Sequence, residues 1–485
     1  MKPRSRILRD AWSGWPHSAT QAGRRMQFRS VIIHDFTVKS TFFMFLGARR
    51  LKKSILTVVV GLCTSLSLLS CGGSSSSQVI LPNRVLASQG VTATLVFGSL
   101  VVVNGQNDTL PRVSPLVQAT SPGLIVVSPT RNIAATVDSS SNTVYAVNTS
   151  KQNSIGNVHL PGPTSSISVP TADPTVYAAV PTATVNGFAF LGAVEVLNFS
   201  TNSFTTIAAS NAQTVVSNSQ GTELLVFSPD SDAVTVLFPG AAAPPVDTSC
   251  YTNPPNQVCT IVLDSRLSRP VNAIVSGSTA YILNCGAQCG GTQQASIAIF
   301  DLGSLTVTQT IPVDAATMAY LNGSTLYVVG TPPTAPANSC TNQTTAATTC
   351  GRLDIVDLSS GTVTSSVSIT DGYHSRMDLT TKGQLFIGSS NCTNIGNVNN
   401  PTSGEIRGCL SIYNISNGSV IFPPDNGDVT GLQGFTTRYV EYVAEGGQLR
   451  VYDTTKGILL INDFVPQGTI DIVGYVGDVK AIDFF

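Results

Sequence analysis

The segment Ile355-Val356-Asp357-Leu358-Ser359-Ser360-Gly361 combines a short apolar strand, an aspartate and a Ser/Gly turn. β-branched and other apolar residues favour a strand that packs on a pleated surface. Aspartate or asparagine at the strand end closes a turn, because its side chain accepts hydrogen bonds from nearby backbone amides. This pattern therefore predicts a β-hairpin that begins near Leu353.

The same pattern recurs along the chain after residue 79, at intervals of about 40 to 60 residues. A further copy, Val234–Phe238, lacks the Asn or Asp residue. Most copies follow another β-rich stretch, and few segments show a helical period. The copies that end in Asn or Asp are Leu100–Asn104, Val144–Asn148, Val194–Asn198, Ile297–Asp301, Leu353–Asp357, Leu410–Asn414 and Leu449–Asp453.

This repeat predicts an all-β chain that folds as a β-propeller of eight four-stranded blades. We expect Thr469–Phe485 to supply the innermost strand of a blade whose other strands come from Arg84–Ala119, which closes the ring. Seven blades remain an alternative if 212–268 pairs differently. The seven consecutive units are 123–163, 164–211, 212–268, 269–314, 315–372, 373–428 and 429–467.

Short stretches of the repeat resemble those of the YVTN-type β-propeller family. They include Val126-Val127-Ser128-Pro129, Leu326-Tyr327-Val328-Val329 and the segment at Ile355. The resemblance covers nearly all of 80–485 and implies the architecture only. The YVTN fold in turn resembles that of propeller lactonases. The chemistry of those enzymes needs clustered acids, His or Arg, often with a metal.

The N-terminal region has the organisation of an export signal. Four basic residues between Arg49 and Lys53 precede an apolar run, Ile55–Leu69, which is shorter than the ~20 residues that span a bilayer. The ending Leu68-Leu69-Ser70-Cys71 resembles the lipobox of bacterial lipoproteins. The resemblance implies cleavage after Ser70 and lipidation of Cys71, with an ordinary signal peptide as the alternative.

These features divide the chain into four parts. We expect 1–43 to be a gene-model extension, 44–70 the signal peptide, 71–79 the lipidated cysteine with a flexible Gly/Ser tether, and 80–485 the propeller. Gly72 after the cysteine resembles the outer-membrane sorting signal of diderm bacteria. The expected location is therefore the cell envelope, with palmitate-type lipidation and an anchor in the outer membrane.

Charge argues against a nucleic-acid partner. Only 11% of the residues are charged, and residues 71–485 hold 14 basic and 25 acidic side chains. Binding to phosphate backbones needs clustered Lys and Arg, which this part of the sequence lacks.

Eight cysteines remain after Cys63 and Cys71, and an exported protein is expected to oxidise them. They lie as sequence neighbours, and in three blades the pair flanks the connection between the second and third strands. We expect four local disulfides whose loops emerge on one face of the disc. A metal site at Cys285/Cys289 is the disfavoured alternative, because no histidine lies nearby in sequence. The expected pairs are Cys250/Cys259, Cys285/Cys289, Cys340/Cys350 and Cys392/Cys409.

Residues of the innermost strands are candidates for ligand contacts in the centre of the ring. His374 and Arg376 belong to a run that opens such a strand, and Tyr373 precedes them; Arg269 and Arg438 lie near other first strands. Polar lining bonded to water is the alternative for each. Asp230-Ser231-Asp232 fits a hairpin turn better than a calcium site. The sequence indicates no catalytic residues, no cofactor and no metal.

Three functions fit this sequence. The first is a monomeric, lipid-anchored binding or scaffold module for a protein or glycan, which an apolar patch on the loop face would favour. The second is a lactonase-like hydrolase, which needs His374, Arg376, Arg269 and Arg438 in one pocket. The third is a structural envelope component without a discrete ligand.

Overall fold

A computed structural model gives the architecture of the chain. It describes residue 81 and residues 83–91, 97–111, 115–170, 175–185, 190–240, 258–334, 350–392, 409–423, 427–454, 468–470 and 475–483. These residues all belong to one compact unit, Ser76–Phe485. The expected extension, the signal peptide, Cys71 and the whole tether lie outside the described residues.

The described residues form thirty-two β-strands and one 3-10 helix, Gly286–Cys289 (η1). The strands of the first four blades along the chain are β1 (Arg84–Gln89), β2 (Gly98–Asn104), β3 (Val117–Ala119); β4 (Pro122–Val127), β5 (Ile133–Asp138), β6 (Thr143–Asn148), β7 (Asn153–His159); β8 (Ser166–Ser168), β9 (Val176–Val180), β10 (Ala193–Asn198), β11 (Ser203–Ala208); β12 (Thr214–Ser217), β13 (Leu224–Phe227), β14 (Ala233–Phe238) and β15 (Val258–Leu263). The remaining strands are β16 (Pro270–Ser276), β17 (Thr279–Asn284), β18 (Ser296–Asp301), β19 (Thr306–Pro312); β20 (Met318–Asn322), β21 (Thr325–Gly330), β22 (Gly351–Asp357), β23 (Thr362–Ile369); β24 (Tyr373–Leu379), β25 (Gln384–Ser390), β26 (Leu410–Asn414), β27 (Val420–Ile421); β28 (Val429–Phe435), β29 (Val440–Glu445), β30 (Gln448–Asp453), β31 (Gly468–Ile470) and β32 (Val476–Ala481).

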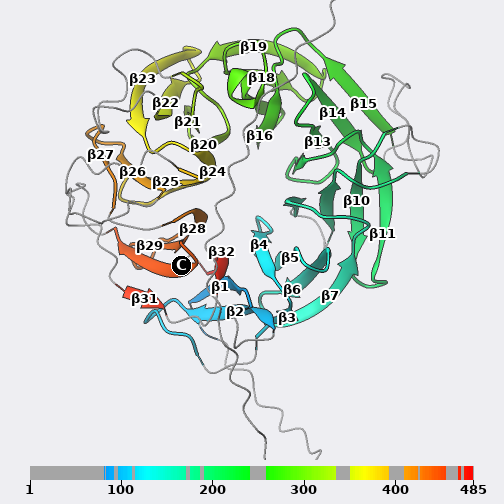
Figure 1. Ribbon diagram of the computed structural model, residues 1–485, viewed down its shortest axis with the longest axis vertical. Coiled ribbons are helices and arrows are strands. Elements are labelled where there is room, and N and C mark those ends of the chain that lie inside the picture. Colours follow the sequence, from blue (N-terminus) through cyan, green and yellow to red (C-terminus); the bar gives the residue numbers. More distant parts are fainter. Residues whose placement is uncertain are drawn as a thin grey trace, which may run out of the picture. The chain divides into compact units, whose positions relative to one another are not determined.

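These strands form eight four-stranded antiparallel sheets, which stand around a common centre as the blades of a ring (Figure 1). The prediction of an eight-bladed β-propeller is therefore confirmed. In seven blades the strands pair in sequence order from the centre outward, beginning with β4, β8, β12, β16, β20, β24 and β28. The unit 212–268 supplies β12–β15 as a regular blade, so the seven-bladed alternative is wrong.

The core of the protein is divided among the spaces between blades. Eight clusters of buried apolar side chains occur, and each one is built from two adjacent blades. The cluster around Phe227 and Phe300, for example, joins β12–β15 to β16–β19. Every blade thus packs on both neighbours, and burial of apolar area between blades stabilises the whole ring.

The eighth blade joins the two ends of the chain. β32 pairs with β1 in register Val85↔Ala481 and forms the innermost strand, followed outward by β1, β2 and β3. The Arg84 guanidinium donates to both carboxylate oxygens of Asp483, at 2.8 Å each, which fixes the two ends together. The predicted ring closure is confirmed. Only part of the expected segment Thr469–Phe485 forms the inner strand, namely Val476–Ala481. Thr469 and Ile470 belong to β31, the outer strand of the preceding blade.

Asn and Asp at the strand ends close turns as expected from the repeat. The carboxylate of Asp357 accepts a hydrogen bond from the Ser359 amide at 2.9 Å, and Asp301 accepts one from the Ser304 amide at 2.7 Å. The side chain of Asn104 does the same for the Gln106 amide at 2.9 Å. These bonds satisfy backbone donors that the sheet leaves unpaired.

The alternation of strands gives the ring two distinct faces. On one face, second strands connect to third strands and fourth strands connect to the next blade. We call this face, which carries Cys285–Cys289 and Tyr373, the loop face. We call turn face the opposite face, where first strands turn into second strands; it carries Arg131 and Thr380. No helix in the described part of the chain is long and apolar enough to cross a membrane.

Candidate functional sites on the two faces

Disulfides brace two connections of the loop face. Cys285 bonds Cys289 between β17 and β18, and Cys392 bonds Cys409 between β25 and β26. Both pairs confirm the prediction from sequence. Cys259 and Cys350 are also disulfide-bonded, whereas their expected partners Cys250 and Cys340 lie outside the described residues.

The position of Cys259 corrects one expectation. Cys259 is the second residue of β15, the fourth strand of its blade, and therefore lies at the end of that strand nearer the turn face. The expectation that all four cysteine pairs lie on one face is wrong for this blade, because its cysteines flank the third-to-fourth connection. Cys350 precedes β22 and lies on the loop face with the two described pairs.

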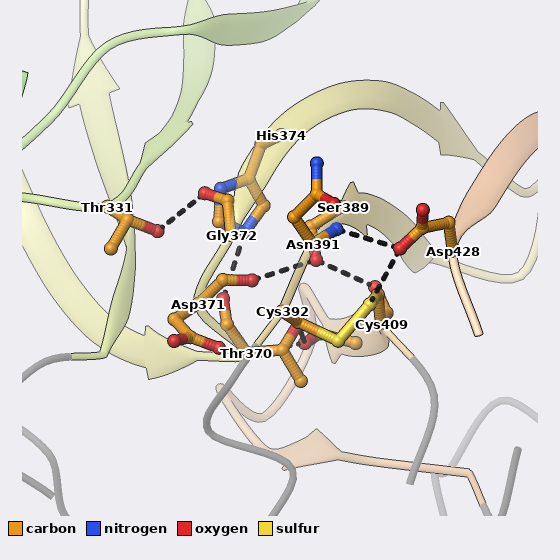
Figure 2. The surroundings of a disulfide bond; sticks show 11 residues. Thr331, Thr370, Asp371, Gly372, His374, Ser389, Asn391, Cys392, Cys409 and Asp428 are labelled. Carbon is orange, nitrogen blue, oxygen red and sulfur yellow. Dashed lines mark hydrogen bonds between the residues drawn. A yellow bond between two sulfur atoms is a disulfide. The ribbon is translucent and has the colours of Figure 1, made fainter. Parts of the chain in front are cut away.

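Hydrogen bonds around Cys392–Cys409 extend the bracing to neighbouring segments (Figure 2). The Ser389 hydroxyl lies 2.9 Å from the carbonyl of Asp371 and 3.2 Å from that of Cys409. The Asn391 amide donates to the Asp428 carboxylate at 2.7 Å, which links the loop to the start of the next blade. The disulfide is thus part of a fixed hydrogen-bonded scaffold at the loop face.

Two cavities lie on the loop face on either side of the Cys285–Cys289 loop. The first has a volume of about 290 Å³ and is lined by Phe227, Pro229, Pro270, Cys289 and Tyr373, among others. The second, about 300 Å³, is lined by residues that include Cys285, Gln288 and Asp314. The disulfide loop therefore forms a wall shared by two hollows, each of which could receive one side chain or one ring of a partner.

Exposed apolar side chains concentrate on the same face. Of the ten large apolar side chains exposed among the described residues, six lie at loop-face connections, three on outer strands and one on the turn face. Phe97 and Phe190 are 64% and 63% exposed. Single exposed apolar residues are common and need no explanation, so the relevant observation is that six of the ten lie on one face. The six are Val91, Phe97, Phe190, Leu191, Tyr373 and Tyr475.

The structure places His374 between blades and away from the centre. Its side chain is fully buried, and ring Nε2 lies 3.0 Å from the Thr370 carbonyl oxygen (Figure 2). Burial lowers the pKa of His374 to about 4, despite the hydrogen bond to Thr370 and the nearby Asp371, which act in the opposite direction. The imidazole is therefore neutral at pH 7 and acts as a packing element.

The other predicted contact residues do not converge on one pocket. Arg376 bridges two inner strands by donating from Nε to the Thr430 carbonyl at 2.7 Å, and Tyr373 lines the 290 Å³ cavity. Arg269 is held at the loop face near Asp232, 3.8 Å away. Arg438 lies on the turn face, where it pairs with Asp108 of the terminal blade at 2.6 Å.

The turn face has a polar site that the sequence did not reveal. Two cavities of about 230 and 460 Å³ open near the ends of inner strands and share Arg131, Tyr320, Asp378 and Gln433. Lys480 of β32 lines the larger cavity. These five residues come from five different blades, so only the ring geometry brings them together. Polar residues at the ends of predicted inner strands were the available signal.

Burial determines the electrostatics of this turn-face site. The carboxylate of Asp378 accepts hydrogen bonds from the Gly434 amide and from Gln433, yet burial raises its pKa. Glu441 of β29 lies behind Gly434, is fully buried, and has a pKa well above the usual range because of burial and the proximity of Asp378. Among the described residues, no group of three or more His, Cys, Asp or Glu side chains is placed to hold a metal ion.

Comparison with known proteins supports the fold of the chain but identifies neither its family nor its function. No protein-family profile matches the chain, and no curated protein matches it. Among solved structures, it is similar to the Dos1 propeller, with a TM-score of 0.50, 9% identity, and coverage of 74% of this chain and 86% of the other.

Two further solved structures are similar at lower scores. Dihydro-heme d1 dehydrogenase NirN has a TM-score of 0.49 at 13% identity and covers 83% of this chain and 75% of its own. The periplasmic gluconolactonase PpgL of Pseudomonas aeruginosa has a TM-score of 0.43 at 14% identity and covers 83% and 99%. At these identities the likeness reaches only the architecture: this chain is a β-propeller.

Proposed function

We propose that the protein is an envelope-anchored binding module that holds a partner protein on its loop face. The observation that carries the proposal is the concentration of exposed apolar side chains on that face, which also carries the two cavities at the Cys285–Cys289 loop. Phe, Leu and Tyr side chains have few rotatable bonds and therefore lose little conformational freedom on binding, which favours their use as contact residues.

The direction of β1 supports an outward orientation of this face. β1 is the second strand of its blade, so it begins at the turn face with Arg84 and runs toward the loop face. A tether from Cys71 would join the propeller at the turn face. In this proposal the lipid anchor holds the turn face toward the membrane and leaves the loop face free for the partner.

The binding surface is tested by replacing exposed apolar side chains in two regions, one on the loop face and one away from it. Phe190→Ser with Leu191→Ser and Tyr373→Ser removes loop-face side chains, and Phe204→Ser with Ile261→Ser removes exposed side chains of the outer strands β11 and β15. We expect the first variant to lose a partner that is crosslinked to the wild type in cells and the second to keep it. Retention of the partner by both variants would contradict the proposal, as would capture of glycan without protein.

The anchor is tested separately. Cys71→Ser should abolish labelling with a palmitate analogue and release the protein from membranes, since stable anchoring depends on the acyl chains. Both tryptophans, Trp12 and Trp15, precede the expected signal peptide, so the processed protein should emit tyrosine fluorescence alone. Membrane attachment that persists in the variant would argue against lipidation at this residue.

No observation favours the hydrolase alternative. Its four residues His374, Arg376, Arg269 and Arg438 occupy separate positions on two faces and between blades.

A further inference from the structure

The turn-face site contains a carboxyl group that nothing in the described structure satisfies. Glu441 is completely buried, and neither of its carboxyl oxygens has a hydrogen-bond partner among the described residues. Such groups are rare in folded proteins, because burial without a partner costs free energy. An unsatisfied buried carboxyl beside a cavity therefore suggests a missing ligand group.

Gly434 directs this carboxyl toward the smaller turn-face cavity. Gly434 lines that cavity and pairs with Glu441 across β28 and β29. A Cβ atom at Gly434 would lie 3.0 Å from Oε2 of Glu441 and 3.2 Å from Oδ2 of Asp378. Both carboxyl groups thus converge on the space that the absent side chain leaves open, at the cavity wall.

Aromatic rings on the same cavity are suited to a cation. Phe435 and Tyr439 line it, and the ammonium group of Lys382 lies 4.6 Å from the centre of the Tyr439 ring. A positive charge over the face of an aromatic ring is stabilised by the ring quadrupole. The contact with Lys382 shows that the Tyr439 ring has a face open to a cation.

The adjoining larger cavity adds a second cationic side chain to the site. Lys480 lines it, and its ammonium group donates to the Leu432 carbonyl at 3.3 Å. No carboxylate in the described part of the chain lies within ion-pair distance of that nitrogen. Arg131 lines both cavities. A carboxylate in the larger cavity would therefore lie near two cationic side chains, of which Lys480 also interacts electrostatically with Asp378 and Glu441.

We propose that the turn-face site binds a small aminocarboxylate, a ligand with an ammonium group at one end and a carboxylate at the other. The ammonium group occupies the smaller cavity against Asp378 and Glu441. The carboxylate lies in the larger cavity near Lys480. The site is separate from the loop face and does not depend on the function proposed for that face.

Binding should be coupled to proton release. In the free protein burial keeps the proton on Glu441, with Asp378 acting in the same direction and Lys480 against it. Tyr320, Tyr439 and Arg131 are the remaining ionisable groups that line the two cavities. When an ammonium group arrives, the O–H bond of the Glu441 carboxyl breaks, the carboxylate pairs with the ammonium, and the proton passes to the buffer.

Calorimetry on the full processed chain in detergent tests this proposal. The probes are glycine, 4-aminobutyrate and 6-aminohexanoate, with butylamine and butyrate as the matched single-ended compounds. We expect at least one aminocarboxylate to bind more tightly than both single-ended probes and to release a proton, measured in buffers of different ionisation enthalpy. Equal binding of butylamine or butyrate, or no binding of any probe, would overturn the proposal.

Variants distinguish this site from general effects on the fold. Glu441→Gln has the same shape but cannot ionise, so it should weaken binding about tenfold and abolish the proton release. Gly434→Ala should also weaken binding, because its Cβ fills the space before the two carboxyls. Glu195→Gln, which alters another fully buried glutamate in a different blade, is the matched control and should leave binding unchanged. Loss of binding in Glu195→Gln, or proton release that persists in Glu441→Gln, would reject the assignment.

Discussion

At the scale of single residues, buried ionisable side chains make the stability of this propeller depend on pH. The free His374 side chain of the unfolded chain takes up a proton near pH 6.5, whereas the folded protein resists protonation until about pH 4. The contribution of neutral His374 to the free energy of unfolding is therefore fully present above pH 6.5 and is lost as the pH falls toward 4. The full difference amounts to about 3 kcal/mol.

The prediction is tested with His374→Gln, which is neutral throughout this range. The stability advantage of the wild type over this variant, measured by urea unfolding, should shrink by about 3 kcal/mol between pH 7 and pH 4. His159→Gln, at an exposed position at the end of β7, is the control. A constant difference between wild type and His374→Gln would show that the histidine does not cause the effect.

At the scale of elements, the loop-face disulfides should stabilise according to the length of chain they close. Cys392–Cys409 spans 17 residues and Cys285–Cys289 spans 4. In the chain-entropy account, replacement of each pair by serines costs about 3 and about 2 kcal/mol, respectively. Urea unfolding of the two double variants gives the comparison. A larger loss for the shorter loop would mean that the bond acts on the native loop-face structure instead.

At the scale of the whole molecule, ring closure depends on one strand. β32 pairs with β1, contacts the innermost strands on both sides, and buries Val476 and Val479. Asp478 accepts a hydrogen bond from the Ile125 amide at 2.8 Å and so joins the last strand to the next blade. Deletion of Val476–Phe485 removes several buried apolar side chains worth about 1.5–3 kcal/mol each.

That loss is comparable with the total stability of a domain, which is about 5–15 kcal/mol. We expect the truncated protein to aggregate or be degraded, as judged by its recovery in the soluble fraction and by its melting curve. An unchanged melting temperature would mean that the ring holds without its closing strand.

The architecture could be predicted because it follows from a short sequence pattern that repeats along the chain. The strand–Asx–turn pattern favoured eight blades over seven, and the partnerless terminal segment indicated the closure. The turn-face site was not predictable, since Asp378, Glu441 and Lys480 are ordinary in sequence and meet only through the ring. The direction of the His374 side chain could not be predicted from the alternation of side chains along β24. A bulge between His374 and Arg376 shifts the pairing of β24 with β25, and His374 faces the neighbouring blade.

The position of β1 determines how the propeller would bear mechanical load. A pull on a tether that precedes Arg84 acts along β1, which has β2 on one side and β32 on the other. Force in this direction shears both rows of hydrogen bonds at once, whereas an edge strand would peel away one bond at a time. Arg84 and Asp483 take up the tension first. A protein held in this way can resist drag on its free face without unravelling from its point of attachment.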